Sequence, residues 1–443
     1  MFERADRRTL LKALAAAGVA AAAPGAAAAS PDLAALRIDA GRLRRGLEDL
    51  SVIGRPAGGA FADGVSRFAY SDADVAGRAF AMGLMRAAGG EPRIDVAGNI
   101  FCRREGGERA LKAIMIGSHI DSVPGGGNFD GALGSLAAIE VLRTLNEAHI
   151  TLRHPLEVAL WSNEEGGTVG SGFAAGVLTP EALELTLNGI RRADGLRKIG
   201  GDPTRIAQAR RPAGSLAAYV ELHIEQSDLL EKAGIPIGVV DGIVAIDEYE
   251  VEIRGFANHA GTTPMPDRRN ALLAAARLIE AVQEEVTREP GRQVGTVGHL
   301  EVFPNARNVV PGLVKHTIEL RDLDAGKIAL IGARIEKRAQ AIAEATGTQI
   351  AMTRVERDEP ALATPAIQRQ IEAAAAALGL KSLHLPSGAG HDAAMIAHIA
   401  PMGMIFVPSL GGISHSPKEL TRWEDCANGA NVLLQSVLRL DLA

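Results

Sequence analysis

A short glycine-rich loop carries the first residues whose types and spacing could do chemistry. In GSHIDSVPGGGNFDGALG, residues 117–134, His119 and two aspartates follow an apolar run, and glycines stand between His119 and Asp130. An imidazole nitrogen and a carboxylate oxygen are both good donors to a divalent metal ion. Glycine carries no Cβ, so the GGGN stretch can turn sharply enough to bring both side chains inward. The loop therefore predicts part of a metal site.

More donors of the same kind lie elsewhere in the chain. Glu164 and Glu165 end the run LEVALWSNEEG, His223 stands in ELHIEQ, and His415 lies in the glycine-flanked GGISHSP. Three imidazoles, a shared aspartate and one further carboxylate suit two divalent ions, zinc or manganese, held about 3.5–4 Å apart. Such ions support hydrolysis by activated water. The sequence shows no positioned serine or cysteine nucleophile motif, which argues against covalent acyl transfer.

These residues need a framework that brings them to one place. Three short apolar runs, at residues 111–121, 156–166 and 217–226, have the pattern of buried parallel strands, and each ends in candidate donors. Ligands bind at the carboxyl edge of such sheets. Residues 131–147 repeat apolar side chains at helical spacing, which predicts a helix with one buried stripe. We expect an α/β domain with a mixed, largely parallel sheet and helices on both faces, to which residues 384–417 also belong.

A segment in between follows a different pattern. In DEYEVEIRG, residues 247–255, apolar and charged residues alternate, as in a strand with one face in water. The pattern then predicts a helix over 268–286, strands over 294–303 and 314–320, a helix over 325–345 and a strand over 349–355. This order is typical of a ferredoxin-like α+β domain. We expect it at residues 247–358, inserted into a catalytic domain made of residues 31–246 and 359–443.

Length and composition set the class of protein. A chain of 443 residues exceeds one ordinary core, which predicts two domains. After the first 30 residues no run reaches the roughly 18 apolar residues of a membrane span, and a formal charge of −6 argues against a nucleic-acid partner. Cys102 and Cys426 are the only cysteines, so at most one disulfide could form. These limits fit a globular enzyme or receptor.

Residues 1–30 differ from the rest of the chain. MFERADRRTLLKALAAAGVAAAAPGAAAAS places Arg7 and Arg8 before a weakly apolar, alanine-rich run that ends in small residues. This pattern is typical of a twin-arginine export signal. We expect cleavage near Ala29 and a periplasmic mature protein. An ordinary amphipathic N-terminal helix is the alternative, and it would leave the protein in the cytoplasm.

Taken together, the motifs resemble those of the M20 metallohydrolases. SHIDSVPGGGNFDG, SNEEG, ELHIEQ, NHAGTTPMPDRRNAL, NARNVVPG, SGAGHDA and GGISHSPKE follow the family's order over about residues 95–425. Within the family they are most similar to the branch of N-carbamoyl-L-amino acid hydrolases, β-ureidopropionases and allantoate amidohydrolases. The histidine of HIEQ separates this branch from the M20 peptidases, which usually place an aspartate there.

The resemblance implies two divalent ions per subunit, Zn²⁺, Mn²⁺ or Co²⁺, and a role for each residue near them. The implied metal ligands are His119, Asp130, Glu165, His223 and His415, with Asp130 as the bridge. Asp121 would orient the His119 imidazole from behind. Only one of the paired glutamates is used for coordination, so Glu164 is the candidate general base.

Substrate-binding residues follow from the same resemblance. His259 would donate to the developing oxyanion when the inserted domain closes over the metals as a lid. Asn308 and Arg321 would clamp the substrate carboxylate, for which an arginine fork is suited, unless Arg321 only pairs with Asp322 or Asp324. The pocket around the ureido group would be completed by Gln226, Gly390 and His391.

These assignments predict a hydrolase of linear carbon–nitrogen bonds other than peptide bonds. We expect a small substrate with a carboxylate and a ureido or amide group, most of all an N-carbamoyl-L-amino acid, with allantoate and N-carbamoyl-β-alanine as alternatives. EEGGTVGSGFAAG lacks the arginine that family members often carry after the paired glutamates, which bears on the identity of the substrate. An M20 aminoacylase or peptidase and a non-catalytic exported binding protein are further alternatives. The resemblance also implies a homodimer through the inserted domain.

Overall fold

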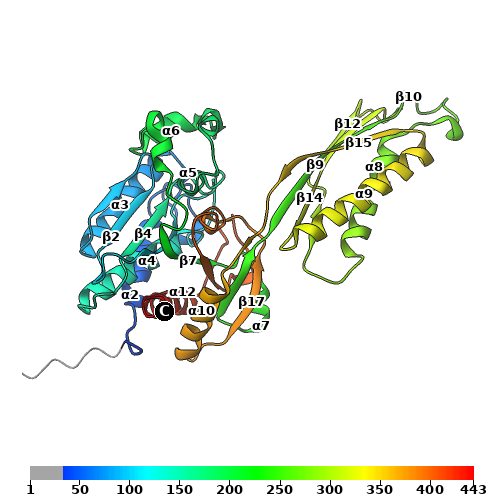
Figure 1. Cartoon of the computed structure of the whole chain (residues 1–443). Helices are drawn as coiled ribbons and strands as arrows, with labels where there is room; N and C mark the ends of the chain where they lie inside the picture. Colours follow the sequence, from blue (N-terminus) through cyan, green and yellow to red (C-terminus); the bar gives the residue numbers. More distant parts are fainter. Residues whose placement is uncertain (1–32) are drawn as a thin grey trace, which may run out of the picture. The chain divides into compact units, whose positions relative to one another are not determined.

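A computed structural model describes residues 33–443 (Figure 1), so the predicted export signal lies outside the described residues. Residues 37–443 form one compact unit with two large sheets. In the described part of the chain, no helix is long and apolar enough to cross a membrane. Cys102 and Cys426 are both buried and free, so the optional disulfide does not form.

The larger sheet carries the predicted metal ligands. It has nine strands in the order β1-β2-β4-β3-β7-β18-β8-β16, with β17 also paired to β8. Its parallel centre consists of β3 (Ala113–His119), β4 (Leu156–Trp161), β7 (Leu216–Ile224) and β18 (Met402–Val407). Nearly every residue of these strands is buried, and a strand covered on both faces needs apolar residues throughout rather than an alternation.

Antiparallel strands flank this parallel centre. One edge consists of β1 (Pro92–Ile94) and β2 (Ile100–Arg104), and the other of β8 (Ile237–Ile243), antiparallel to β18, and β16 (Ala361–Leu362). Only β17 (Ser382–Ser387) runs parallel to β8. The prediction of a mixed, largely parallel sheet is therefore confirmed.

Helices cover both faces of the larger sheet. One face packs against α4 (Ala132–Glu147), α10 (Pro365–Ala377) and α12 (Trp423–Asp441), and the other against α5 (Val169–Ala175) and α11 (Asp392–Ile396). Further out, α2 (Ala40–Leu50) and α3 (Asp72–Ala87) lie on α4. The prediction that α4 buries only a single stripe is wrong. Thirteen of its 16 residues are buried, because α4 lies between the sheet and these other helices.

The smaller sheet comes from the inserted segment and has five antiparallel strands. They are β9 (Ala245–Arg254), β11 (Val294–Thr296), β12 (Leu300–Phe303), β14 (Leu313–Asp322) and β15 (Gln349–Arg357), in the order β11-β14-β9-β15 with β12 also on β14. Figure 1 shows α8 (Ala271–Thr287) and α9 (Ala325–Thr346) side by side on one face of this sheet. The chain thus follows the strand and helix order of a ferredoxin-like unit.

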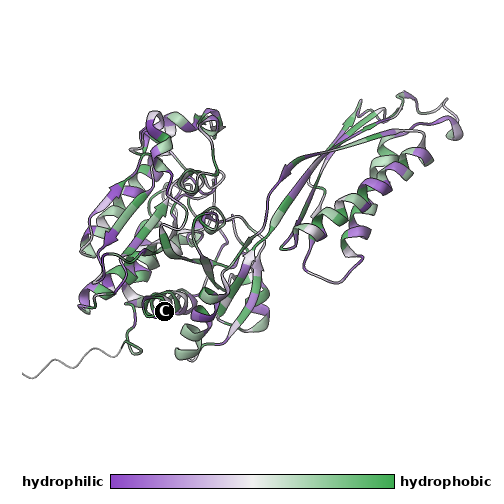
Figure 2. Cartoon of the chain, viewed as in Figure 1, coloured by the Kyte–Doolittle hydropathy of each residue, from purple (hydrophilic) through white to green (hydrophobic). Residues whose placement is uncertain are grey.

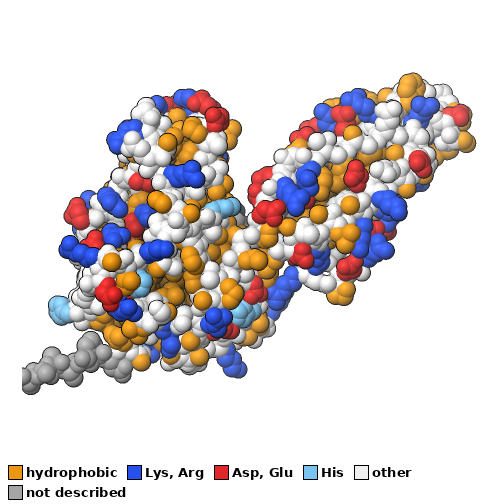
Figure 3. All heavy atoms as spheres, viewed as in Figure 1, with side chains coloured by type: hydrophobic (Ala, Val, Ile, Leu, Met, Phe, Trp, Pro, Cys, Tyr) orange, Lys and Arg blue, Asp and Glu red, His pale blue; other side chains and the backbone are white. Residues whose placement is uncertain are grey.

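This smaller sheet has a core of its own. Val251, Ile253 and Ile318 are buried against α8 and α9, while the charged residues between them face away. Figure 2 shows both hydrophobic and hydrophilic residues along the two helices, and Figure 3 shows acidic and basic side chains interspersed over the unit. The predicted alternation in β9 is confirmed, because only one face of the sheet is covered.

Two predicted boundaries in the inserted segment are wrong. The helix expected from residue 268 begins at Ala271, because the Asn270 side chain accepts from the backbone N–H groups of Leu272 and Leu273 and caps the helix there. The single strand expected over residues 294–303 is two short strands, β11 and β12, which both pair with β14.

Candidate active site

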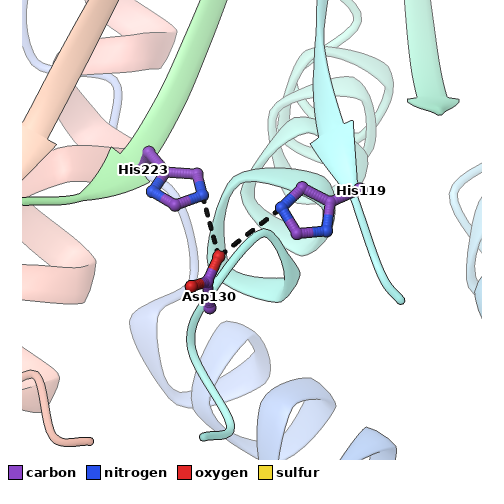
Figure 4. A group of neighbouring side chains, drawn as sticks. All are labelled: His119, Asp130 and His223. Atoms are coloured by element: carbon purple, nitrogen blue, oxygen red, sulfur yellow. Dashed lines mark ion pairs between the residues drawn. The ribbon is translucent and has the colours of Figure 1, made fainter. Parts of the chain in front are cut away.

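The carboxyl ends of neighbouring parallel strands bring two of the predicted histidines together. His119 is the last residue of β3 and His223 the penultimate residue of β7, and each is 1% exposed. Figure 4 shows both imidazoles turned toward Asp130, which precedes α4. Oδ1 of Asp130 lies 3.5 Å from Nε2 of His119 and 3.1 Å from Nε2 of His223. These three residues form the first donor group.

A second donor group uses the other oxygen of the same aspartate. Oδ2 of Asp130 lies 3.5 Å from Nε2 of His415, which in turn lies 3.2 Å from Oε2 of Glu165. Asp130, Glu165 and His415 thus meet in one place. The structure therefore brings all five predicted ligands together, as two groups that share one carboxylate.

The donor set fits divalent metal ions. Backbone carbonyls face the Nδ1 atoms of both buried histidines, at 3.0 Å from the Asp121 carbonyl for His119 and 2.9 Å from the Ile224 carbonyl for His223. A carbonyl accepts Nδ1–H and leaves Nε2 free to donate its lone pair. Nε2 of His119 and Oε1 of Glu165 are buried and have no hydrogen-bond partner within residues 33–443. Imidazole nitrogens combined with carboxylate oxygens suit Zn²⁺, Mn²⁺ or Co²⁺.

Asp121 acts differently from the prediction. Its carboxylate Oδ1 is 3.8 Å from Nδ1 of His119, and its backbone carbonyl is the nearer acceptor. The carboxylate instead accepts from the backbone N–H groups of Glu164, at 3.3 Å, and Glu165, at 3.1 Å. Asp121 therefore fixes the paired glutamates after β4 with its side chain and orients His119 with its main chain.

Glu164 lies beside the first donor group. Its Oε2 is 3.6 Å from Nε2 of His119, and the side chain is 9% exposed. Burial raises the pKa of the Glu164 carboxyl well above its usual range, and the nearby Asp392 and Glu165 carboxylates add to this, while His119 acts against it. The position of this carboxyl group beside the donor atoms is the one that a proton carrier needs.

One cavity of about 620 Å³ joins most of the predicted residues. Its lining includes Asp130, Glu164, Glu165, His223, Gln226, Gly390, His391 and His415. Nε2 of Gln226 donates to Oδ2 of Asp130 at 2.9 Å. The buried His391 ring lies 4.5 Å from the His223 ring, centroid to centroid, and its Nε2 is 2.8 Å from Oγ of Ser387. A larger cavity of about 680 Å³ beside β1 and β2 contains none of the predicted residues.

Comparison with known proteins identifies the family. A model of the peptidase family M20/M25/M40 matches residues 115–439. The chain belongs to this family. The N-carbamoyl-L-amino acid amidohydrolase of Geobacillus stearothermophilus is 41% identical over 409 residues, which cover 91% of this chain and 99% of that protein. The ureidoglycolate hydrolase of Arabidopsis thaliana is 36% identical over 419 residues, which cover 91% of this chain and 87% of that protein.

A solved structure agrees with these relatives. The crystal structure of an amidase of the hydantoinase/carbamoylase family from Burkholderia multivorans has a TM-score of 0.84 and 36% identity, and covers 92% of this chain and 99% of its own. The predicted membership of the carbamoylase branch is confirmed. The M20 chain is a hydrolase that acts on carbon–nitrogen bonds other than peptide bonds.

The structure of the M20 hydrolase does not bring three predicted substrate residues into the cavity. His259 is exposed on β10 (Asn258–His259), which pairs with β13 (Val309–Val310), and the carbonyl of Asn308 accepts from Ala260 N at 2.9 Å. Arg321, at the end of β14, pairs with Glu319 at 2.8 Å and donates to the Gly388 carbonyl at 2.7 Å. The alternative prediction, in which Arg321 only pairs with Asp322 or Asp324, is wrong. Arg321 thus lies next to the loop that contributes Gly390.

Glu419 is a functional candidate that the sequence analysis missed. It is 3% exposed, and its Oε1 accepts from the backbone N–H groups of Phe129, at 2.9 Å, and Asp130, at 3.0 Å. Its Oε2 accepts from Oγ of Ser414 at 2.9 Å. The side chain therefore ties the Asp130 loop of the M20 hydrolase to the loop of His415. The available signal was its position in GGISHSPKE, four residues after His415.

The glycines of the opening loop serve two purposes. Gly131 has a φ of +60°, and a Cβ there would overlap the His119 ring. Gly127 has no positive φ, but a Cβ there would overlap the Glu419 carboxylate. Within the GGGN stretch, the predicted sharp turn holds at Gly125, which has a φ of +65°, whereas Gly127 is needed for space.

Proposed function

We propose that this M20 hydrolase is a metal-dependent amidohydrolase that converts N-carbamoyl-L-amino acids to the amino acid, CO₂ and ammonia. The observation that carries the proposal is the pair of donor groups that share Asp130, with the buried Glu164 carboxyl beside them in one cavity. The high identity to an N-carbamoyl-L-amino acid amidohydrolase over nearly its full length supports the substrate class. A binding protein without turnover would have no use for a general base next to the donors.

Two divalent ions, Zn²⁺, Mn²⁺ or Co²⁺, fit the donors. His119, His223 and Asp130 would hold one, and Asp130, Glu165 and His415 the other. When bound there, the ions supply Lewis acidity toward the ureido carbonyl and activate water for attack. Glu164 would take the proton of that water on its carboxylate and deliver it to the leaving nitrogen. Gln226 and His391 line the same cavity and would contact the ureido group.

Three further residues complete the proposed machinery. Arg321 would bind the substrate carboxylate with its planar guanidinium, and its contact with the Gly388 carbonyl keeps it near the cavity. His259 has Nδ1 occupied by the N–H groups of Gly261 and Thr262, at 3.0 and 3.1 Å, which leaves Nε2 to donate to an oxyanion. His259 and Asn308 would reach the substrate when the inserted unit closes as a lid.

A substrate panel tests this function. The purified protein, reconstituted with Mn²⁺, Co²⁺ or Zn²⁺, is given N-carbamoyl-L-amino acids, N-carbamoyl-β-alanine, allantoate, ureidoglycolate, N-acetyl amino acids and dipeptides, and ammonia and amino acid are measured separately. We expect both products together from the N-carbamoyl-L-amino acids. Turnover of N-acetyl compounds or dipeptides alone would show an aminoacylase or peptidase. Preferred turnover of ureidoglycolate would favour the activity named for the plant relative.

We propose a homodimer formed through the inserted unit. Its edge strand β12 presents Leu300 and Phe303, each 44% exposed, and pairs on one side only, with β14. An exposed apolar edge strand is a template for pairing with another chain. Light scattering after size-exclusion chromatography should give the mass of a dimer for the wild type and of a monomer for Phe303→Lys. A monomeric wild type would contradict this assembly.

We propose export of the folded protein by its twin-arginine signal. The support is the sequence pattern of residues 1–30, with Arg7 and Arg8 before the alanine-rich run. Cell fractionation should find the protein in the periplasm, and the Arg7→Lys/Arg8→Lys variant in the cytoplasm. Equal periplasmic amounts of both forms would contradict the proposal.

A further inference from the structure

The cavity of the proposed active site extends well beyond the metal donors, along an apolar wall. After α5 the chain turns through Gly176, so that Val177 and Leu178 line the cavity. From the helix α11, Ala394 and Met395 line it beside them, and these two helices pack against each other. None of these four side chains can donate a hydrogen bond, and the thioether of Met395 is only a weak acceptor. The wall is therefore suited to an apolar group.

The wall belongs to the same segments as the catalytic residues. Thr168 and Leu178 follow the paired glutamates along the chain, and Met395 follows His391 within one helical turn. A substrate with its ureido group at the donors would thus have its remaining groups directed along this wall. Ile243, Val244 and Ile246 also line this cavity. They lie where the chain passes from β8 into β9 of the inserted unit, so they extend the apolar wall in that direction.

Acidic residues also line the same cavity. Glu356, Asp358 and Glu359 line it, with Arg357 as the only cation of that stretch. Nε of Arg357 pairs with Glu359 at 3.4 Å, so among the described residues of this stretch the one cation is already engaged by the third carboxylate. Burial raises the pKa of the Glu356 carboxyl, repulsion from Asp358, Glu248 and Glu319 adds to this, and Arg321 acts against it. An additional anion on the substrate would meet repulsion here.

We propose that this M20 hydrolase selects N-carbamoyl-L-amino acids whose side chain is apolar and of about leucine or methionine size, with Leu178 and Met395 as specificity-determining residues. The inference rests on the proposed function and names the substrate class of that site. A second carboxylate on the substrate is excluded by Glu356 and Asp358.

The first test compares substrates that differ only in the side chain. The metal-reconstituted full chain is assayed with N-carbamoyl derivatives of leucine, methionine, glycine, asparagine and aspartate. We expect kcat/KM for leucine and methionine to exceed that for glycine by at least about tenfold, as one well-filled apolar pocket can provide. The aspartate derivative should be poorer than the asparagine derivative, which has the same shape without the charge. Equal kcat/KM for all five, or a preference for aspartate, would overturn the inference.

Variants then assign the effect to residues. Leu178→Ala and Met395→Ala should each lower kcat/KM for the leucine derivative about tenfold while leaving the glycine derivative within about twofold. Leu185→Ala is the matched control, because Leu185 is 55% exposed and does not line the cavity. Glu356→Gln with Asp358→Asn should raise kcat/KM for the aspartate derivative alone. Unchanged ratios in these variants would overturn the assignment.

A binding measurement separates this inference from the proposed reaction. Titration calorimetry of free L-leucine, L-methionine, glycine and L-aspartate into the metal-loaded protein ranks the side chains without turnover. If no N-carbamoyl compound is hydrolysed but leucine and methionine still bind more tightly than glycine and aspartate, the proposed function fails and the apolar pocket stands. If N-carbamoyl compounds are hydrolysed and the ranking is flat, the proposed function stands and the pocket assignment fails.

Discussion

Glu419 gives the sharpest test of how the two donor groups are held together. Its carboxylate accepts three hydrogen bonds, from the backbone N–H groups of Phe129 and Asp130 and from Oγ of Ser414, and two of them end on the loop of Asp130. Glu419→Ala removes all three acceptors. Glu419→Gln keeps an oxygen that can accept from both backbone groups, removes the charge, and replaces the oxygen that accepts from Ser414 by an NH₂ group.

The magnitude follows from those contacts. Two buried N–H groups left without a partner cost about 1–3 kcal/mol each, so the alanine variant should lose about 2–6 kcal/mol before any relief. Part of this is offset, because burial raises the pKa of Glu419 to about 7 and its charge is repelled by Asp130. We therefore expect a net loss of stability near the lower end, about 2 kcal/mol.

Metal affinity is the decisive readout. Residues that position a metal ligand typically change affinity about 10–100-fold when removed, so Glu419→Ala should weaken Mn²⁺ or Zn²⁺ binding by that factor. Glu419→Gln should stay within about fivefold of the wild type, because the Asp130 loop keeps its acceptor. Metal content after dialysis and the metal-dependent shift of the unfolding temperature measure both. Glu424→Ala, at an exposed glutamate, is the control.

Two results would refute this reasoning. If Glu419→Ala bound metal as tightly as the wild type, the three hydrogen bonds would not position the ligands. If the glutamine variant lost as much affinity as the alanine variant, the charge of Glu419 would matter rather than its acceptor geometry.

Three further outcomes are expected. Glu164→Gln should keep its metal, measured by elemental analysis, and lose at least about 100-fold in kcat, because a general base contributes that much; near-normal turnover would contradict its role. Chelation followed by dialysis should abolish turnover and lower the unfolding temperature, and added Mn²⁺ should restore both; a chelated protein with full activity would exclude metal dependence. Burial lowers the pKa of His316, so below its unfolded pKa the unfolded chain binds more protons than the folded chain. The contribution of neutral His316 to the free energy of unfolding is therefore fully present above about pH 6.5 and is lost as the pH falls below it. His316→Leu should therefore lose less unfolding temperature between pH 7 and pH 5 than the wild type, and an equal loss would contradict this.

The sequence was sufficient where a residue's place follows from its own strand. His119, His223 and Glu165 could be grouped because their runs end at the same edge of a parallel sheet, and that edge is fixed by strand direction alone. The start of α8 was placed too early, because residues 267–270 are all polar and carry no apolar pattern, so that only the Asn270 cap marks the boundary.

Residues that depend on distant partners could not be found in this way. The acceptor of the Asp130 backbone lies 289 positions away, at Glu419, and no local pattern encodes such a contact. The motif around His259 predicted a catalytic role, but its location depends on the pairing of β10 with β13 within the inserted unit. Asp121 was assigned to the correct neighbour, His119, yet its side chain binds the backbone of Glu164 and Glu165 in the loop after β4.

The division of the donors along the chain has a consequence for synthesis. His119, Asp130 and His223 all precede the inserted segment, so a nascent chain that has just passed β7 already contains every member of the first donor group. His415 follows the inserted segment, and Glu419, which holds Asp130 in place, follows His415. The second group is therefore assembled only after the ribosome has released the C-terminal strand and loop. A chain truncated after residue 407 would keep the first three donors without the clamp that positions their shared aspartate.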